Sequence, residues 1–193
     1  MGTVADDLRA SLLTAASDLL AEGGPEALTV RGIASAAGVS TMGVYSRFGG
    51  KEGVVDALLA DGFRALLDEM RRRPPSNDPR ADLLACAQAY RRFALANPTR
   101  YEVMFATAWP GFEPSADSLV CAAGTFAEVM ANVQRALDAG VLDGFEAHEL
   151  AASIWATCHG LVSLEIIDKR PPVLADDDPF DRTIEALIRG FEP

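Results

Sequence analysis

The stretch from Ala27 to Lys51 constrains the fold of this chain more than any other segment. Its apolar residues recur at helical spacing on both sides of Gly38, which predicts two short helices joined by a tight turn. The stretch contains Arg31, Arg47 and Lys51 but no acidic residue, although the whole chain of 193 residues has a formal net charge of −11. A small basic surface on a helix-turn-helix is the pattern that recognition of duplex DNA requires.

The first of these helices is expected to begin after Thr29, whose hydroxyl can accept a hydrogen bond from a free backbone N–H one turn further on. Gly38 stands where a helix end favours a left-handed residue, because glycine adopts that conformation at little cost. Val39 can then fill the angle between the helices. Four apolar side chains at helical spacing are predicted to face the core: Val30, Ile33, Ala34 and Ala37.

The second helix is predicted from Thr41 to about Phe48, with Ser40 as its cap. A further helix starts at Lys51, and its N-terminal N–H groups would attract anions. The inward side chains of the second helix are predicted to be Val44, Tyr45 and Phe48. Its opposite face could enter a major groove roughly 12 Å wide. That face consists of small, polar or basic residues: Thr41, Met42, Gly43, Ser46 and Arg47.

Three segments of this region carry a resemblance to a known family. Spacing, glycines, aromatic residues and lysine agree together in them, over a match that runs from about residue 8 to residue 59. The sequence resembles the N-terminal DNA-binding domain of the TetR family of bacterial transcriptional regulators. The matching segments are Thr29–Ala34, Ala37–Ser40 and Val44–Glu52.

The resemblance implies a role for each residue of the predicted surface. Tyr45 and Lys51 would contact DNA phosphates, with Thr29 beside them. Arg31 would reach in from the preceding helix. The residues nearest the bases would be Thr41, Met42, Gly43 and Arg47.

Other roles stay open on the residues alone. Tyr45 could be a core aromatic side chain, and Met42 could be plain surface. Arg47 could be a base contact, a phosphate contact or only a solvated charge. Short amphipathic helices joined at a glycine also occur in all-helical proteins that bind no DNA.

Composition limits the classes to which the chain can belong. Hydrophobic residues make up 49% of the sequence, enough for a substantial core, yet no apolar run reaches the roughly 18 residues that cross a bilayer. The N-terminus lacks the basic and then apolar order of a signal peptide, and the three cysteines are widely spaced. We therefore expect a cytoplasmic protein with free thiols and no membrane partner.

Acidic charge is concentrated beyond the basic stretch. Residues 1–51 hold 4 basic and 5 acidic side chains, a net charge of −1. The remaining 142 residues hold 13 basic and 23 acidic side chains, a net charge of −10. Because an acidic surface repels DNA phosphates, the duplex is expected to approach only through the N-terminal end.

The pattern of the whole chain predicts an all-α protein. Helical segments are separated by short stretches rich in Pro, Gly or Asp, and no segment alternates like a strand. Residues 1–50 are predicted to form a three-helix helix-turn-helix DNA-binding domain, which a long helix joins to a helical bundle within residues 51–193. The expected helices outside the basic stretch are about 6–22, 51–72, 80–97, 98–108, 115–139, 145–168 and 180–191, with loops at 109–114 and 169–179.

The helix expected at 145–168 is apolar over a wide arc, so it must be buried on more than one side. An internal core together with a second subunit would achieve this. The TetR resemblance also implies a twofold dimer that binds two half-sites roughly 34–36 Å apart. Trp155, His159 and Gly160 resemble the Trp-His-Gly signature of one C-terminal domain group of this family, and Phe93–Phe105 resembles the same group.

The resemblance further implies a small-molecule site between the connecting helix and the long helices. Few charged residues interrupt these helices, so we expect a small effector that is mostly apolar or aromatic. His159 could bond a carbonyl or orient such a ligand. Aromatic and Met side chains at helical spacing are also the usual contents of a plain core. The candidate wall residues are Phe63, Tyr90, Phe93, Met104, Phe105, Trp109, Phe126, Met130, Trp155 and His159.

The sequence therefore predicts a ligand-responsive transcriptional repressor that binds pseudo-palindromic operator DNA as a homodimer and is released by an effector. Two alternatives stay open: a DNA-binding regulator without small-molecule sensing, and a helical-bundle enzyme. The enzyme is disfavoured because neither His148 nor His159 follows a Glu by three residues, as di-iron bundles require. We expect no catalytic residue, no metal and no cofactor.

Overall fold

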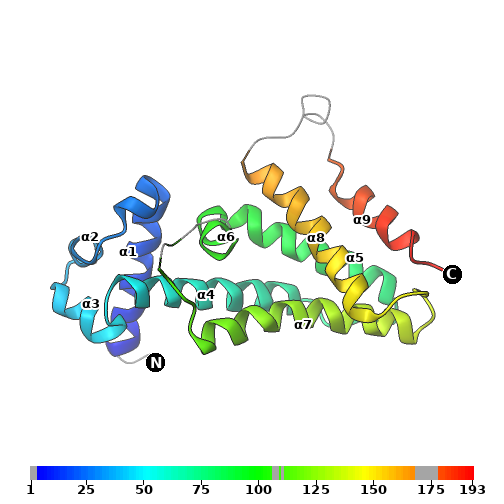
Figure 1. Ribbon diagram of the computed structural model, residues 1–193, viewed down its shortest axis with the longest axis horizontal. Helices are drawn as coiled ribbons and strands as arrows, with labels where there is room; N and C mark the ends of the chain where they lie inside the picture. Colours follow the sequence, from blue (N-terminus) through cyan, green and yellow to red (C-terminus); the bar gives the residue numbers. More distant parts are fainter. Residues whose placement is uncertain (1–3, 106–108, 110, 168–177) are drawn as a thin grey trace. The chain divides into compact units, whose positions relative to one another are not determined.

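Helices account for all the regular structure in the computed structural model, which describes residues 4–105, 109, 111–167 and 178–193. The predicted all-α class is confirmed for these residues (Figure 1). Within the same ranges, no helix is both long enough and apolar enough to cross a bilayer. In chain order the helices are α1 (Val4–Ala27), α2 (Val30–Ala36), α3 (Thr41–Phe48), α4 (Lys51–Arg71), α5 (Pro79–Ala96), α6 (Pro98–Phe105), α7 (Ala116–Asp138), α8 (Ala147–Ile166) and α9 (Phe180–Arg189).

The helix boundaries differ from the predicted ones mainly at α1. This helix begins at Val4 rather than near residue 6, and it continues to Ala27. It is kinked at Gly24, whose φ of 64° lies in the left-handed region. The helix end predicted near residue 22 is therefore a kink at Gly24, after which one short turn continues to Ala27. The end of the helix expected at 98–108 and most of the loop expected at 169–179 lie outside the described residues.

Contacts between residues divide the chain into two compact units. Unit 1 comprises residues 1–63 and 99–121, and unit 2 comprises residues 64–98 and 122–193. Both α4 and α7 contribute residues to each unit. The predicted boundary between residues 50 and 51 separates the part of the chain expected to bind DNA from the rest, and it stays a prediction.

The core of unit 1 brings α1, α2 and α3 together with the first part of α4. α2 packs against both α1 and α3, so α1 braces the two short helices (Figure 1). Val103 of α6 joins the same core, and Trp109 and Phe112 pack against it. The side chains with no exposed surface in this core are Leu12, Ala16, Leu28, Ile33, Val44 and Val54.

Hydrogen bonds to Asp56 fix the start of α7 to α4 within unit 1. Ser115 donates to the Asp56 carboxylate from its backbone N–H (2.8 Å) and from its hydroxyl (2.7 Å), and Ser118 Oγ donates to the Asp56 carbonyl (3.1 Å). Burial alone would raise the pKa of Asp56, but hydrogen bonds from Ser115 and Ser118 hold it below its ordinary value. Segment 99–121 is thus anchored to α4 by polar contacts as well as by packing.

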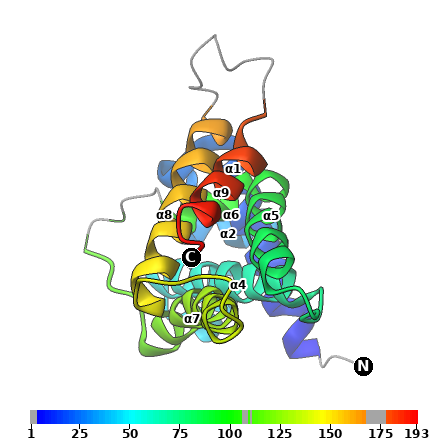
Figure 2. The same cartoon turned by 90° about the vertical axis from the view of Figure 1, so that its right-hand side faces the viewer.

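In unit 2, α5, α8 and α9 pack against one another (Figure 2). Arg91 of α5 donates to both carboxylate oxygens of Glu165 on α8, from Nε (3.0 Å) and from Nη2 (2.7 Å). Its Nη1 donates to Asp178 just before α9 (2.8 Å), and the guanidinium lies 5.1 Å from the centre of the Phe180 ring. One side chain therefore links three helices of this unit.

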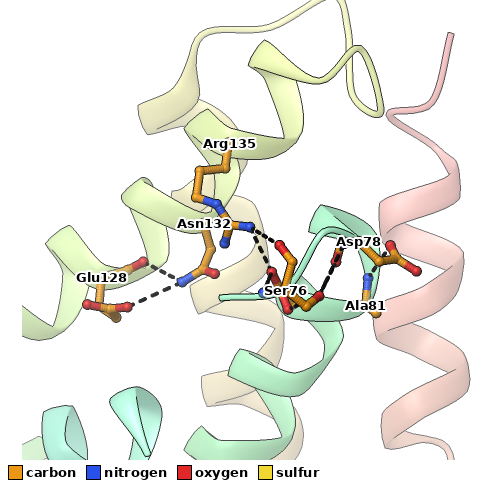
Figure 3. A network of polar contacts seen from close by, with 7 residues as sticks. Ser76, Asp78, Ala81, Glu128, Asn132 and Arg135 are labelled. Atoms are coloured by element: carbon orange, nitrogen blue, oxygen red, sulfur yellow. Dashed lines mark hydrogen bonds and ion pairs between the residues drawn. The ribbon is translucent and has the colours of Figure 1, made fainter. Parts of the chain in front are cut away.

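A second polar network joins the segment after α4 to α5 and α7 (Figure 3). Ser76 donates to the Asp82 carboxylate from its backbone N–H and its hydroxyl, both at 2.8 Å. Arg135 Nη2 donates to Asp82 Oδ2 and to the Ser76 carbonyl, also at 2.8 Å. Burial would raise the pKa of Asp82, but the hydrogen bonds from Ser76 and Arg135 outweigh it and lower this pKa.

Substitution Asp82→Asn should lower the free energy of unfolding at pH 7 by about 1–3 kcal/mol, because it removes a charged acceptor from the half-buried donors of Ser76 and Arg135. Since the folded-state pKa of Asp82 lies below the unfolded-state value, this contribution is complete above about pH 4 and is lost as the pH falls through the folded-state pKa. Urea unfolding at pH 7 and at acidic pH measures the difference between wild type and variant. The exposed Asp68→Asn on α4 is the control. An undiminished difference at low pH would contradict the assignment.

Candidate nucleic-acid interface

The helix-turn-helix begins and turns as the sequence predicts. Thr29 Oγ1 accepts a hydrogen bond from the Gly32 backbone N–H (3.0 Å), so Thr29 caps α2. Gly38 has a φ of 68°, and the hydrogen bonds Val39 N–H to Ala34 carbonyl (2.9 Å) and Gly38 N–H to Ser35 carbonyl (3.2 Å) close a Schellman motif. α2 therefore ends in a tight turn in which the Ala34 and Ser35 carbonyls stay hydrogen-bonded.

The inward side of α3 is narrower than the sequence predicts. Val44 is fully buried and Phe48 is half-buried, but Tyr45 is 53% exposed. The prediction that Tyr45 packs inward is wrong, because Val44 and Phe48 already occupy the side of α3 that faces the core. Ser40 stands at the cap position as predicted, but its side chain makes no capping hydrogen bond.

The end of α3 depends on two glycines. Gly49 ends the helix with a φ of 73°, and its N–H donates to the Tyr45 carbonyl at 2.9 Å. Gly53 lies in the first turn of α4, where a Cβ would overlap the carbonyl of Phe48. The close approach of α4 to the end of α3 therefore requires glycine at position 53.

The predicted DNA-facing residues of α2 and α3 are exposed to solvent, except Gly43. Met42 is 70% exposed, and Gly43 is half-buried. Within the described part of the chain, neither Arg31 nor Arg47 forms an ion pair, so both charges are available to a ligand. The exposed members of the predicted set are Thr29, Arg31, Thr41, Met42, Tyr45 and Arg47.

Lys51 differs from these residues because it has partners within unit 1. Its Nζ donates to the Pro25 carbonyl (3.2 Å) and lies 5.7 Å from the centre of the Trp109 ring. Lys51 is half-buried and stands at the first position of α4. No local pattern in the sequence indicates these contacts, since Pro25 and Trp109 are distant along the chain.

The predicted effector-wall residues fall into two groups. In unit 1, Phe63 and Phe105 make an edge-to-face contact with ring centres 5.5 Å apart. Met104 lies against Gly62, and Trp109 contacts Lys51. The predicted wall residues of unit 1 are Phe63, Met104, Phe105 and Trp109, and those of unit 2 are Tyr90, Phe93, Phe126, Met130, Trp155 and His159.

Four of the unit 2 residues form one aromatic cluster. Trp155 stacks on His159 (5.6 Å between ring centres) and meets Phe126 edge to face (6.3 Å). The Tyr90 hydroxyl and His159 Nδ1 are 3.1 Å apart and share a hydrogen bond. Burial lowers the pKa of His159, which favours the neutral imidazole.

Two hollows in unit 2 adjoin one another, since Met70 and Cys86 line both. The first is a polar cavity of about 160 Å³ between α4, α5 and α7. Its charged wall residues are Glu69, Arg71, Arg73, Asp82, Arg92 and Glu128. The second is an apolar cleft with room for about one water molecule (about 10 Å³). Its further wall residues include Leu83, Tyr90, Ile154, Trp155 and Cys158.

The polar cavity is the feature that sequence reasoning missed. Arg71 Nε donates to Glu128 at 2.6 Å, and Arg92 Nε donates to Glu69 at 3.1 Å. Opposite charges from three helices therefore meet around it. The run of three arginines at positions 71–73 is the one local signal, but Arg71 pairs with Glu128 on α7, which is far along the chain.

A capped helix-turn-helix with an exposed basic face defines a class of DNA-binding transcriptional regulators. The family model "Bacterial regulatory proteins, tetR family" matches residues 12–58, and the model "Tetracyclin repressor-like, C-terminal domain" matches residues 83–190. The second match covers more than half of the chain. The chain belongs to the TetR family of transcriptional regulators.

Curated relatives of the chain include HTH-type transcriptional regulators from two mycobacteria. The chain is 25% identical over 142 residues to Rv1816 of Mycobacterium tuberculosis, a match that covers 72% of this chain and 59% of that protein. The regulator Mb1846 of Mycobacterium bovis matches with the same values. The chain thus matches about three-fifths of the length of these relatives.

Solved structures share the fold over nearly the full chain. A protein with unknown function from Rhodococcus sp. RHA1 has a TM-score of 0.81 and 26% identity, and the match covers 100% of this chain and 97% of that one. The TetR-family regulator PfmR from Thermus thermophilus has a TM-score of 0.71 and 20% identity, with 94% and 99% coverage. The second likeness concerns the fold alone.

Proposed function

We propose that this TetR-family regulator is a ligand-responsive repressor, which binds pseudo-palindromic operator DNA as a homodimer and is released by a small-molecule effector. The observation that carries the proposal is the exposed, acid-free face of α2 and α3, with Lys51 at the start of the next helix. A bacterial repressor of this kind acts in the cytoplasm, where its operator is. Membership of a family of regulators favours this function over a helical-bundle enzyme.

The arrangement of α3 supports separate sets of residues for base contacts and for phosphate contacts. Thr41, Met42, Gly43 and Arg47 lie on the helix that would enter the major groove, so they are proposed to face the bases, with Arg31 beside them. Tyr45, Lys51 and Thr29 flank this face and are proposed to contact phosphates. The exposure of Tyr45 supports a phosphate contact rather than a core role.

Variants Lys51→Ala and Arg47→Ala should affect DNA binding differently once an operator has been selected from random duplexes. Lys51→Ala should weaken binding to all duplexes alike and reduce the salt slope by about 1, because it removes a phosphate contact. Arg47→Ala should weaken operator binding by about 1–3 kcal/mol and relax the sequence preference. Fluorescence anisotropy at several salt concentrations measures both effects.

The exposed Arg189→Ala on α9 is the matched control, since it removes one positive charge from unit 2. Its affinity should equal that of wild type. Unchanged operator affinity in both Lys51→Ala and Arg47→Ala would refute the proposed interface.

The outer face of α8 supports the proposed homodimer. Trp155 and Leu164 of α8 are 36% and 43% exposed, and Ile167, directly after the helix, is 54% exposed. Ala152, Ala156 and Gly160 are also exposed, at helical spacing along α8. A second copy of the same face would cover these apolar groups, and the small residues would permit close packing in a twofold arrangement.

Substitution Ala156→Arg should convert the dimer to a monomer, because it introduces a charge into the centre of this face. Sedimentation velocity at micromolar concentration, without DNA, measures the change. The control is Ala131→Arg, at another exposed helical alanine, on α7, which should stay dimeric. A dimer in both variants would exclude the α8 face, and a monomeric wild type would exclude the two-half-site proposal.

The adjoining hollows of unit 2 support an effector with two chemical halves. Its polar end would lie in the cavity, and its apolar or aromatic part would widen the cleft beside Met70 and Cys86, which has room for only about one water molecule before binding (about 10 Å³). Burial raises the pKa of Cys86 and of Cys158 to about 12, so both thiols stay neutral in the cleft. The effector releases DNA only to the extent that it binds the DNA-free conformation more tightly.

Substitution Ala85→Trp should fill the polar cavity, which Ala85 lines, and block an amphipathic probe. The probe is the dye anilinonaphthalene sulfonate, whose fluorescence increases in apolar surroundings. Titration should show saturable binding to wild type, weakened about fivefold or more in Ala85→Trp, and unchanged in the exposed Leu95→Trp on the same helix. Equal binding to all three proteins would exclude this cavity, and a thermal melt confirms that each variant is folded.

A further inference from the structure

The ammonium group of Lys51 is held between two groups that are distant in sequence. Nζ donates to the Pro25 carbonyl at 3.2 Å and lies over the Trp109 ring, 5.7 Å from its centre. An ammonium group has three N–H donors, so this arrangement leaves donors for a DNA phosphate. Lys51 and Trp109 also line a groove of about 220 Å³, which keeps this part of unit 1 open to a ligand.

Local structure places both partners of Lys51. The Pro25 carbonyl is among the last four of α1, which ends at Ala27, so it has no N–H partner within the helix and accepts from a side chain. A turn closed by the Phe112 N–H and the Trp109 carbonyl (3.0 Å) orients the aromatic residue. Trp109 and Phe112 then pack against the unit 1 core.

The chemistry of the indole group indicates what Trp109 does there. Its Nε1–H is buried without a hydrogen-bond partner in the described part of the chain, which is an unfavourable position for a tryptophan. A smaller aromatic ring would fill apolar space without burying that donor. Among aromatic side chains, the indole offers a cation the most favourable face. The contact with the Lys51 ammonium group is therefore one that an indole ring makes more favourably than a phenyl or phenol ring.

We propose that Trp109 is a positioning residue for DNA binding, which orients the Lys51 ammonium for a backbone phosphate. This inference rests on the proposed function, because it requires Lys51 to contact DNA.

A double-mutant cycle on the full-length protein tests the proposal, with a selected operator duplex as the probe. Trp109→Leu should weaken binding about two- to fivefold, the range for a cation–π contact near the surface. Trp109→Phe should retain part of the affinity, because a phenyl ring keeps a weaker face for the cation. In a Lys51→Ala background, Trp109→Leu should have no further effect, since the residue it positions is gone.

The outcomes separate this inference from the proposed function. Undiminished DNA binding by Lys51→Ala would refute the phosphate contact itself. A loss in Lys51→Ala together with wild-type affinity in Trp109→Leu would refute only the positioning role. An equal loss from Trp109→Leu in both backgrounds would also refute it, because a general packing defect acts without Lys51.

Fluorescence supplies a readout that packing alone would not change. The chain has two tryptophans, so subtracting the emission change of Trp109→Phe from that of the otherwise unchanged protein isolates the contribution of Trp109. Operator binding should shift or quench this Trp109 emission, and the change should be absent when Lys51→Ala is added at saturating DNA. The same spectral change with and without Lys51 would overturn the proposal.

Discussion

The helix-turn-helix depends on one backbone conformation, that of Gly38 between α2 and α3. Its positive φ lets Val39 donate back to Ala34, so α2 ends and α3 begins within a few residues. Ile33 and Val44 can then be buried in one core while the opposite face of α3 stays in solvent. A side chain at Gly38 would meet no atom within 4 Å, so the requirement for glycine is conformational rather than steric.

Local patterns predict the parts of the fold whose causes are local. The Thr29 cap, the Gly38 turn and the helix end at Gly49 each depend on residues within five positions, and the structure has all three. Tyr45 shows where this reasoning fails. Helical spacing allows it on either side of α3, and the choice depends on how fully Val44 and Phe48 fill the core side.

Contacts between distant residues could not be predicted in this way. Lys51 and Pro25 are 26 positions apart, and Arg135 and Asp82 are 53 apart. A periodic pattern records which face of a helix is apolar, but it does not record which other helix supplies a charge to that face. The polar cavity of unit 2 therefore could not be predicted, although the wide apolar arc of α8 was evident from its sequence.

The grouping of residues 99–121 with the helix-turn-helix bears on how an effector could act. Coupling between two sites requires an element whose arrangement both sites can bias. α4 is one candidate, because it belongs to both units. α7 is a second, since it also belongs to both units and the hydrogen bonds of Ser115 and Ser118 to Asp56 fasten its start to α4. The Trp109 ring against Lys51 Nζ also constrains the position of the ammonium group, which the backbone of α4 alone does not fix.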